Sequence, residues 1–403
     1  MYHKTTLLFI LFNLLFIGTG NKVAAASASN TSQKEIGHYI VRRGSLANSF
    51  YKFAHEKKGC VAFLGGSITE MKGWRNMVQE DLRKRFPDTV FKFIDAGIGS
   101  TGSTPHAFRF ENDILQKGTP DLLFVEAAVN DHTNKFSPED QVRGMEGIVR
   151  HARQVSPNMD IIMLHFVYAP FLKMLELGIQ PDVIMNHERV ANYYRITSIN
   201  LAQEIAERLR DKEFIWEQFG GTHPSLFGHT FYAKAIGNLF DSEQQSMESQ
   251  RIQAHSLPGR PLDQLSYSQG AFIDIREATE LDGFKYVESW KPAPTPKAST
   301  RNSFVQVPML EAKEAGASLK LDFTGKAIGI FCVAGPNAGI LEYSIDGKPF
   351  RKIKTHTAWS NKVYLPWVYM FSKNLKPGQH TLTIRIGKGE KTECQIRNFV
   401  VNR

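Results

Sequence analysis

Short apolar runs alternate with amphipathic stretches between residues 58 and 242, and this alternation constrains the fold more than any other feature. Five runs read as buried strands: Cys60–Leu64, Val90–Ile94, Leu122–Val125, Ile161–Val167 and Phe214–Trp216. Apolar residues at helical spacing predict helices near residues 74–86, 138–155, 182–209 and 226–240. Buried strands that alternate with helices form a parallel sheet covered on both faces. The sequence therefore predicts a three-layer α/β domain.

The pattern changes after residue 270. Strand-like runs are expected at Ser318–Phe323, Ile328–Val333, Ile340–Ile345 and His380–Ile386, and turn signals such as Asp346-Gly347 follow them. Short strands with regular turns predict an antiparallel β-sandwich. We therefore expect an α/β domain over residues 29–245, a linker over 246–270 rich in Gln, Ser and Glu, and a β-sandwich over 271–403.

The N-terminus has the pattern of a secretory signal peptide. Lys4 precedes the apolar run Leu7–Ile17, and the small residues Ala24-Ala25-Ala26 follow it. The rival interpretation is a membrane anchor, but a span needs roughly 20 apolar residues. We expect residues 1–28 to be removed and the protein to be secreted or periplasmic, without stable membrane insertion.

Composition limits the partners and cofactors. The net charge is +9, and residues 271–403 hold 20 Lys and Arg against 12 Asp and Glu, so this part could attract acidic glycans or serve solubility alone. No nucleic-acid-binding motif is present, and none of the residue spacings indicates a metal or cofactor site. Cys60 lies in an apolar run and is expected in the core, whereas pairing of Cys332 with Cys394 stays open.

Four polar loops follow the predicted elements of the first domain. Ser67 lies in Gly-Gly-Ser after the first strand, and Gly99 and Ser100 lie in a glycine-rich loop after the second. Asn130 follows the third strand, and His223 precedes the last helix. Each loop alone is typical of an ordinary turn or cap. Together they offer a serine nucleophile, a base, and donors for an oxyanion.

These four loops, in this order over about 185 residues, resemble the four blocks of the SGNH (GDSL-like) hydrolase superfamily. The resemblance implies a flavodoxin-like sheet with Ser67 as nucleophile and His223 as base. It also implies an oxyanion hole made by the Ser67 N–H, an N–H of Gly99 or Ser100, and the Asn130 amide. No metal or cofactor is expected.

The sequence departs from the family pattern in three places. The first block reads Gly-Gly-Ser rather than Gly-Asp-Ser, and Ser100 stands where Gly is usual. In the fourth block Gly220 occupies the position of the Asp that orients the His. Loss of that acid costs a serine protease roughly four orders of magnitude in rate.

Three explanations of this loss remain open. A backbone carbonyl could hold His223 in a Ser-His dyad, another acid could replace the Asp, or the site could have lost ordinary ester hydrolysis. Glu217 is the nearest upstream acid, with Asp131 and Glu126 as more distant candidates. Asp131 and His132 are also candidates to line the pocket.

The second domain resembles the jelly-roll accessory domains of extracellular carbohydrate-active enzymes, through Asp346-Gly347 and Lys376-Pro377-Gly378-Gln379-His380. This combination predicts a secreted serine esterase that removes acyl groups, O-acetyl above all, from a polysaccharide or oligosaccharide. The alternatives are a catalytically weakened glycan-binding protein and glycan chemistry other than ester hydrolysis.

Overall fold

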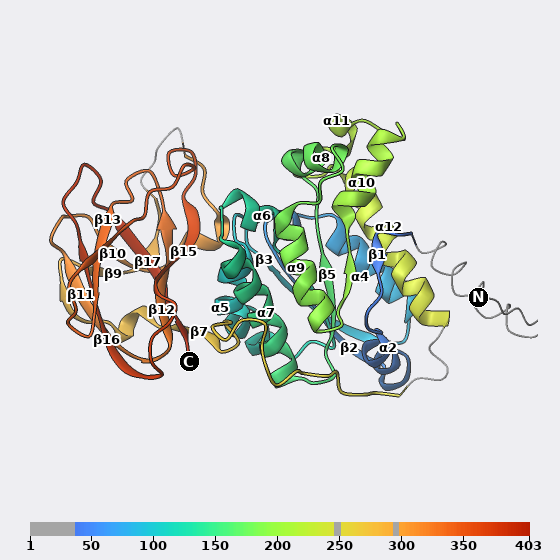
Figure 1. Ribbon diagram of the computed structural model, residues 1–403, viewed down its shortest axis with the longest axis horizontal. Helices are drawn as coiled ribbons and strands as arrows, with labels where there is room; N and C mark the ends of the chain where they lie inside the picture. The colour runs from blue at the N-terminus through green and yellow to red at the C-terminus, as the bar shows by residue number, and fades with distance from the viewer. Residues whose placement is uncertain (1–36, 246–250, 293–297) are drawn as a thin grey trace, which may run out of the picture. The chain divides into compact units, whose positions relative to one another are not determined.

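The computed structural model describes residues 37–245, 251–292 and 298–403. The predicted signal peptide, residues 1–28, lies outside the described residues. Residues Tyr39–Arg403 form one compact unit that contains an α/β domain followed by a β-sandwich (Figure 1). Within the described ranges, no helix has the length and apolar character needed to cross a bilayer.

The α/β domain is built on a six-stranded sheet in the order β1-β6-β5-β4-β2-β3. Its strands are β1 (Ile40–Val41), β2 (Lys58–Gly65), β3 (Val90–Gly97), β4 (Leu122–Glu126), β5 (Asp160–Leu164) and β6 (Thr197–Ile199). All pair in parallel except the short β1, which is antiparallel to β6. Counted from β2, the parallel strands follow the order 2-1-3-4-5, which is the flavodoxin-like order. The predicted fold class is confirmed.

Helices cover both faces of this sheet (Figure 1). On one face α5 (Ser103–Asp113), α7 (Pro138–Val155) and α9 (Asp182–Tyr193) pack side by side. On the other, α12 (Leu226–Gln245) packs against α2 (Ala47–Tyr51), α4 (Trp74–Arg85) and α10 (Leu201–Arg210). The remaining helices are short: η1 (Lys52–Glu56), α3 (Ser67–Glu70), η2 (Leu115–Lys117), α6 (Ala128–Thr133), α8 (Ala169–Glu176) and α11 (Trp216–Phe219).

The prediction of a strand at Phe214–Trp216 is wrong. Phe214 is buried against the rings of Phe219, Phe227 and Phe231, and Trp216 begins α11. The fifth parallel strand is β6, inside the segment 182–209 that the periodicity predicts as a single helix. Arg195, with φ 53°, lies between α9 and β6 and interrupts that helix.

Arg109 forms more than an ion pair along α5. It pairs with Asp113 at 2.8 Å, but its side chain is fully buried. Its guanidinium donates to the carbonyls of Gly65 and Ala96 at 3.1 and 2.7 Å. Arg109 therefore joins the carboxyl ends of β2 and β3, where the polar loops begin.

The second domain consists of two antiparallel sheets. One has the order β15-β12-β17-β10-β9 with β7 also paired to β17, and the other has the order β14-β13-β16-β11-β8. The strands are β7 (Gly270–Ile273), β8 (Thr279–Asp282), β9 (Lys285–Trp290), β10 (Val307–Ala312), β11 (Ser318–Gly325), β12 (Ala327–Ala334), β13 (Ile340–Ile345), β14 (Arg351–Lys354), β15 (Leu365–Ser372), β16 (Gly378–Ile386) and β17 (Cys394–Asn402). Two 3₁₀ turns, η4 (Ile275–Glu277) and η5 (Asn302–Phe304), lie between strands.

The sandwich packs on the α/β domain through α5, which contacts β7, β15 and β17. Phe108 of α5 belongs to the same buried cluster as Phe331 of β12 and Val400 of β17. The three cysteines are all free: Cys332 and Cys394 are buried in the sandwich, and Cys60 is half-buried against the core. The cluster that Phe108 shares with Phe331 and Val400 fixes the sandwich next to the loops at the edge of the parallel sheet.

Candidate active site

The four polar loops converge at the carboxyl edge of the parallel sheet. Ser67 is the first residue of α3, directly after β2, and Asn130 lies in α6 after β4. The chain turns from β2 to β3 on one side and then continues to β4 on the other. Ligands of open α/β sheets bind at such a reversal of strand order, outside the carboxyl ends.

Ser67 and His223 are brought together from positions 156 residues apart. The Ser67 Oγ lies 2.8 Å from the His223 Nε2, although the histidine sits on the loop between α11 and α12. His223 is exposed, but burial of part of its ring, and in second place the positive charge of Arg301, lower its pKa below the ordinary value. A neutral imidazole at this distance can accept the hydroxyl proton.

No acid orients His223 in the described part of the chain, where its Nδ1 forms no hydrogen bond. Gly220 has φ 100°, and a Cβ at this position would lie 2.1 Å from the Ser225 amide nitrogen. The backbone therefore has no room for the Asp of the family pattern. Glu217 is exposed in α11 and forms no contact with His223 among the described residues. The structure does not bring the predicted orienter Glu217 to the histidine.

The two candidates for the second-block donor differ. The Gly99 N–H donates to the Glu70 carboxylate at 2.8 Å. The Ser100 N–H has no acceptor among the described residues, so it is the donor left for a ligand. Ser100 has φ 71°, a conformation that a residue other than glycine adopts at a cost in free energy.

Asn130 lies against the loop that carries Ser67. A Cβ on Gly66 would come within 2.1 Å of the Asn130 Oδ1, so this glycine permits the close approach of the amide. As the first residue of α3, Ser67 has an N–H without an intrahelical acceptor. Ser67, Ser100 and Asn130 thus offer the three donors that the resemblance implies.

Arg301 is a site residue that sequence reasoning missed. It lies in the β-sandwich, just before η5, and its guanidinium contacts the Ser100 Oγ at 3.1 and 3.2 Å. It also lies beside Gly99, where a Cβ would meet its Nε at 3.0 Å. The second domain therefore reaches the loop that supplies an oxyanion donor. A contact across 201 residues leaves no signal in local sequence pattern.

Glu126 supports the loop that carries Ser67 from the interior of the domain. Its fully buried carboxylate accepts the Gly66 N–H at 2.5 Å and the Thr69 hydroxyl at 3.0 Å. Burial raises the pKa of Glu126 to about 7, against the lowering effect of these two hydrogen bonds. Glu126 is thus part of the support for Ser67 and does not orient His223.

Of the two candidates for lining the pocket, Asp131 lies in the interior and His132 lies at the surface. Asp131 is fully buried, accepting the Ser103 N–H at 2.7 Å and contacting the His187 Nε2 at 2.9 Å. It holds the start of α5 and cannot line a pocket. His132 is exposed, its Nδ1 pairs with the Tyr168 hydroxyl, and burial of part of its ring lowers its pKa.

The α/β domain matches a known protein family. Residues 63–231, from β2 into α12, match the model of the GDSL-like lipase/acylhydrolase family. This match spans most of the α/β domain. All four polar loops fall inside the matched span, and the predicted SGNH (GDSL-like) family and class of carboxylic ester hydrolase are confirmed.

Solved structures reproduce the arrangement of both domains. A two-domain esterase (CEX) active on acetylated mannans, co-crystallised with mannopentaose, superimposes with a TM-score of 0.72 at 21% identity. The match covers 90% of this chain and 97% of the esterase chain. The same esterase without that ligand gives 0.71 at 22% identity, covering 90% and 98%. No curated relative matches the sequence. At this identity the likeness shows the two-domain fold alone.

Proposed function

We propose that this protein is a serine esterase that removes O-acetyl groups from a polysaccharide or oligosaccharide. The observation that carries the proposal is the 2.8 Å contact between the Ser67 Oγ and the His223 Nε2. This contact lies among three donors, from Ser67, Ser100 and Asn130, at the edge of the sheet where ligands of this fold bind.

The reaction proceeds through an acyl-enzyme. Nε2 of His223 takes the Ser67 proton while Oγ attacks the acetyl carbonyl, and the three donors stabilise the oxyanion. The bond between the acetyl carbon and the sugar oxygen then breaks, and His223 gives its proton to that oxygen. Water attacks the acetyl-serine next, with His223 again as base, which releases acetate and restores the Ser67 hydroxyl.

Two features support a glycan as the substrate. The first is the sandwich domain, which contacts the second-block loop through Arg301. The second is the two-domain esterase of the same fold, whose substrates are acetylated mannans. Acetylated mannan is therefore the first substrate to test. The signal-peptide pattern of residues 1–28 supports export to the periplasm or the medium.

One observation favours the alternative of a weakened enzyme that binds glycans. Among the described residues the Nδ1 of His223 has no acceptor, whereas an orienting acid contributes a large factor to serine hydrolases. Binding without turnover is what this alternative predicts.

Acetate release from acetylated mannan, acetylated xylan and 4-nitrophenyl acetate tests the proposal. Ser67→Ala is expected to lower kcat/KM by about a thousandfold or more. Ser242→Ala, whose hydroxyl donates to Leu239 in α12, is the matched control and should retain full activity. Glycan binding by the wild type with no acetate release would establish the alternative instead.

A further inference from the structure

A second candidate site lies at the opposite edge of the parallel sheet. A cavity of about 450 Å³ is lined by three stretches of the α/β domain, near residues 43–48, 193–195 and 251–258, and by Arg153. Asp160 and Thr197, which begin β5 and β6, contact lining residues of this cavity, whereas Ser67 follows the carboxyl end of β2. The cavity is therefore separate from the candidate active site.

The lining carries an excess of positive charge. Counted over the described residues, it contains Arg43, Arg153, Arg195 and Arg251 and no Asp or Glu. Arg43 is neutralised, because it pairs with Glu188 outside the lining. Arg195 and Arg251 are exposed and form no hydrogen bond or ion pair through their side chains within the described ranges.

Arg153 is the buried member of this group. Its residue is only 3% exposed, and Nη1 donates to the carbonyls of Tyr194 and Ser256 at 2.7 and 3.0 Å. Among the described residues its buried Nε has no hydrogen-bond partner, and no carboxylate forms an ion pair with Arg153. Burial lowers the pKa of Arg153 to about 10, which leaves the side chain charged at neutral pH. The charge of Asp160 favours the charged arginine although the two form no ion pair, and an anion in the cavity would offset more of the cost of this burial.

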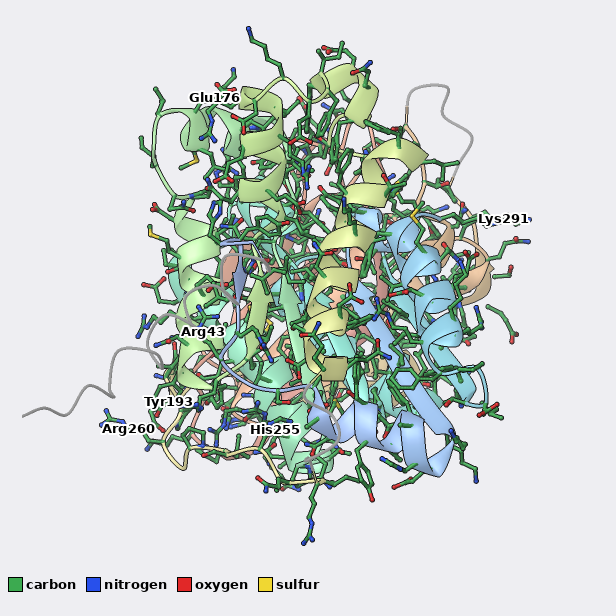
Figure 2. All side chains as sticks on the ribbon, turned by 90° about the vertical axis from the view of Figure 1, so that its right-hand side faces the viewer. Arg43, Glu176, Tyr193, His255, Arg260 and Lys291 are labelled. Atoms are coloured by element: carbon green, nitrogen blue, oxygen red, sulfur yellow. The ribbon has the colours of Figure 1, made fainter. Side chains whose placement is uncertain are left out.

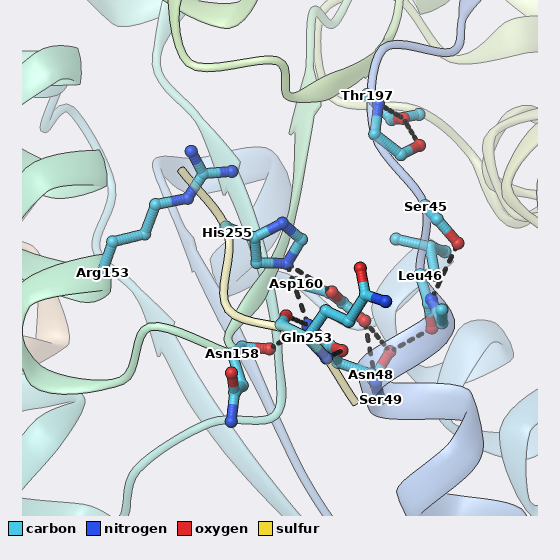
Figure 3. A network of polar contacts seen from close by, with 12 residues as sticks. Ser45, Leu46, Asn48, Ser49, Arg153, Asn158, Asp160, Thr197, Gln253 and His255 are labelled. Atoms are coloured by element: carbon cyan, nitrogen blue, oxygen red, sulfur yellow. Dashed lines mark hydrogen bonds and ion pairs between the residues drawn. The ribbon is translucent and has the colours of Figure 1, made fainter. Parts of the chain in front are cut away.

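The nearest buried carboxylate is already engaged. Asp160 accepts hydrogen bonds from the Ser49 N–H and hydroxyl, both at 2.7 Å, and its other oxygen lies 2.7 Å from the His255 Nε2. Figure 3 shows the guanidinium of Arg153 standing apart from this network. Both oxygens of Asp160 are thus engaged by Ser49 and His255, and its charge acts on Arg153 without an ion pair.

The cavity also presents an aromatic surface. Tyr193 is 37% exposed and its hydroxyl donates to the Arg260 carbonyl at 2.8 Å, which fixes the ring. Figure 2 shows Arg43, Tyr193 and His255 on one side of the α/β domain. A volume of 450 Å³ falls within the range of roughly 300–1,000 Å³ that is usual for small-molecule sites. An aromatic ring beside guanidinium groups suits a sugar ring that carries a carboxylate.

We propose that this cavity binds an acidic sugar residue, with the carboxylate held by Arg153, Arg195 and Arg251 and the sugar ring against Tyr193. This site would hold acidic glycan at a distance from the ester that is cleaved. It does not depend on the reaction proposed for Ser67.

Calorimetric titration of the full mature chain carrying Ser67→Ala tests this proposal, with glucuronic acid, glucose and inorganic sulfate as probes. Glucuronic acid should bind and glucose should not. The double substitution Arg195→Ser and Arg251→Ser changes exposed side chains and should weaken glucuronate binding about a hundredfold, since each lost charge-assisted hydrogen bond accounts for about tenfold.

Arg260→Ser removes an exposed arginine nearby that does not line the cavity, and it should leave glucuronate binding unchanged. Absence of glucuronate binding, or equal binding by the double variant, would overturn the site. Sulfate binding as tight as that of glucuronate would overturn the assignment to a sugar.

Discussion

Replacing Arg301 by Gln removes the positive charge that the sandwich domain places beside the candidate active site. In the wild type this guanidinium holds the Ser100 Oγ at 3.1 and 3.2 Å, and its charge lowers the pKa of His223. The substitution should therefore act in two ways. It should loosen the loop that carries the Ser100 N–H, and it should make His223 easier to protonate.

The two effects have different sizes and signatures. A hydrogen bond to a charged group contributes about 1.5–3 kcal/mol. Because Arg301 is partly exposed, the lower end applies, which corresponds to about a tenfold loss in kcat. Since the base must be neutral, a higher pKa of His223 moves the acidic limb of the kcat/KM profile to higher pH.

The assay is hydrolysis of 4-nitrophenyl acetate and of an acetylated glycan between pH 4.5 and 9, with buffer blanks subtracted. Arg301→Lys keeps the charge but loses the planar fork, so it should lower kcat and leave the acidic limb in place. Lys388→Gln removes an exposed charge from the same domain and serves as control. An Arg301→Gln enzyme with wild-type kcat and an unmoved acidic limb would refute the assigned role.

Three further substitutions test the support of the site. Gly220→Asp introduces the family acid where φ is 100° and a Cβ lies 2.1 Å from the Ser225 nitrogen, so urea unfolding should show a loss of about 2 kcal/mol or more, without a gain in activity. Gly66→Ala should displace the Asn130 amide and lower kcat by roughly a hundredfold while circular dichroism shows a folded chain. Burial raises the pKa of Glu126 to about 7 from 4.5, so the folded state retains a proton that the unfolded state releases, and stability falls as the pH rises through this window. Glu126→Gln should flatten that fall in urea unfolding measured between pH 4.5 and 8.

Local sequence pattern predicts those strands and helices whose apolar spacing and turn residues lie within a few positions of one another. The strand expected at Ile340–Ile345 coincides with β13, because its apolar residues end at the turn Asp346-Gly347, where φ is 55° and 68°. β6 was missed because it is three residues long and lies between helices of matching periodicity. Aromatic packing explains the opposite error at Phe214, whose ring belongs to a cluster beside α12 rather than to a strand.

The site was predictable only in part for the same reason. Ser67, Asn130 and His223 each follow a strand or precede a helix, so their loops could be placed at one sheet edge. The role of Arg301 depends on the packing of the sandwich against α5, and that of Glu126 on its burial beneath Gly66. Both arise from tertiary contacts between residues at least 60 positions apart.

The charge acting on His223 is opposite in sign to that of a catalytic triad. An Asp partner stabilises the imidazolium that forms as the serine attacks, whereas Arg301 destabilises it. The His223 imidazole therefore remains neutral down to a lower pH. The imidazolium that forms during catalysis is less stable for the same reason. The same guanidinium contacts the hydroxyl of Ser100, whose backbone is left-handed and whose N–H is the donor proposed for the oxyanion. The sandwich domain therefore supports the oxyanion donor rather than the protonated histidine. Weakening the contact of the sandwich with α5 should reduce kcat even for a small activated ester that needs no glycan contact.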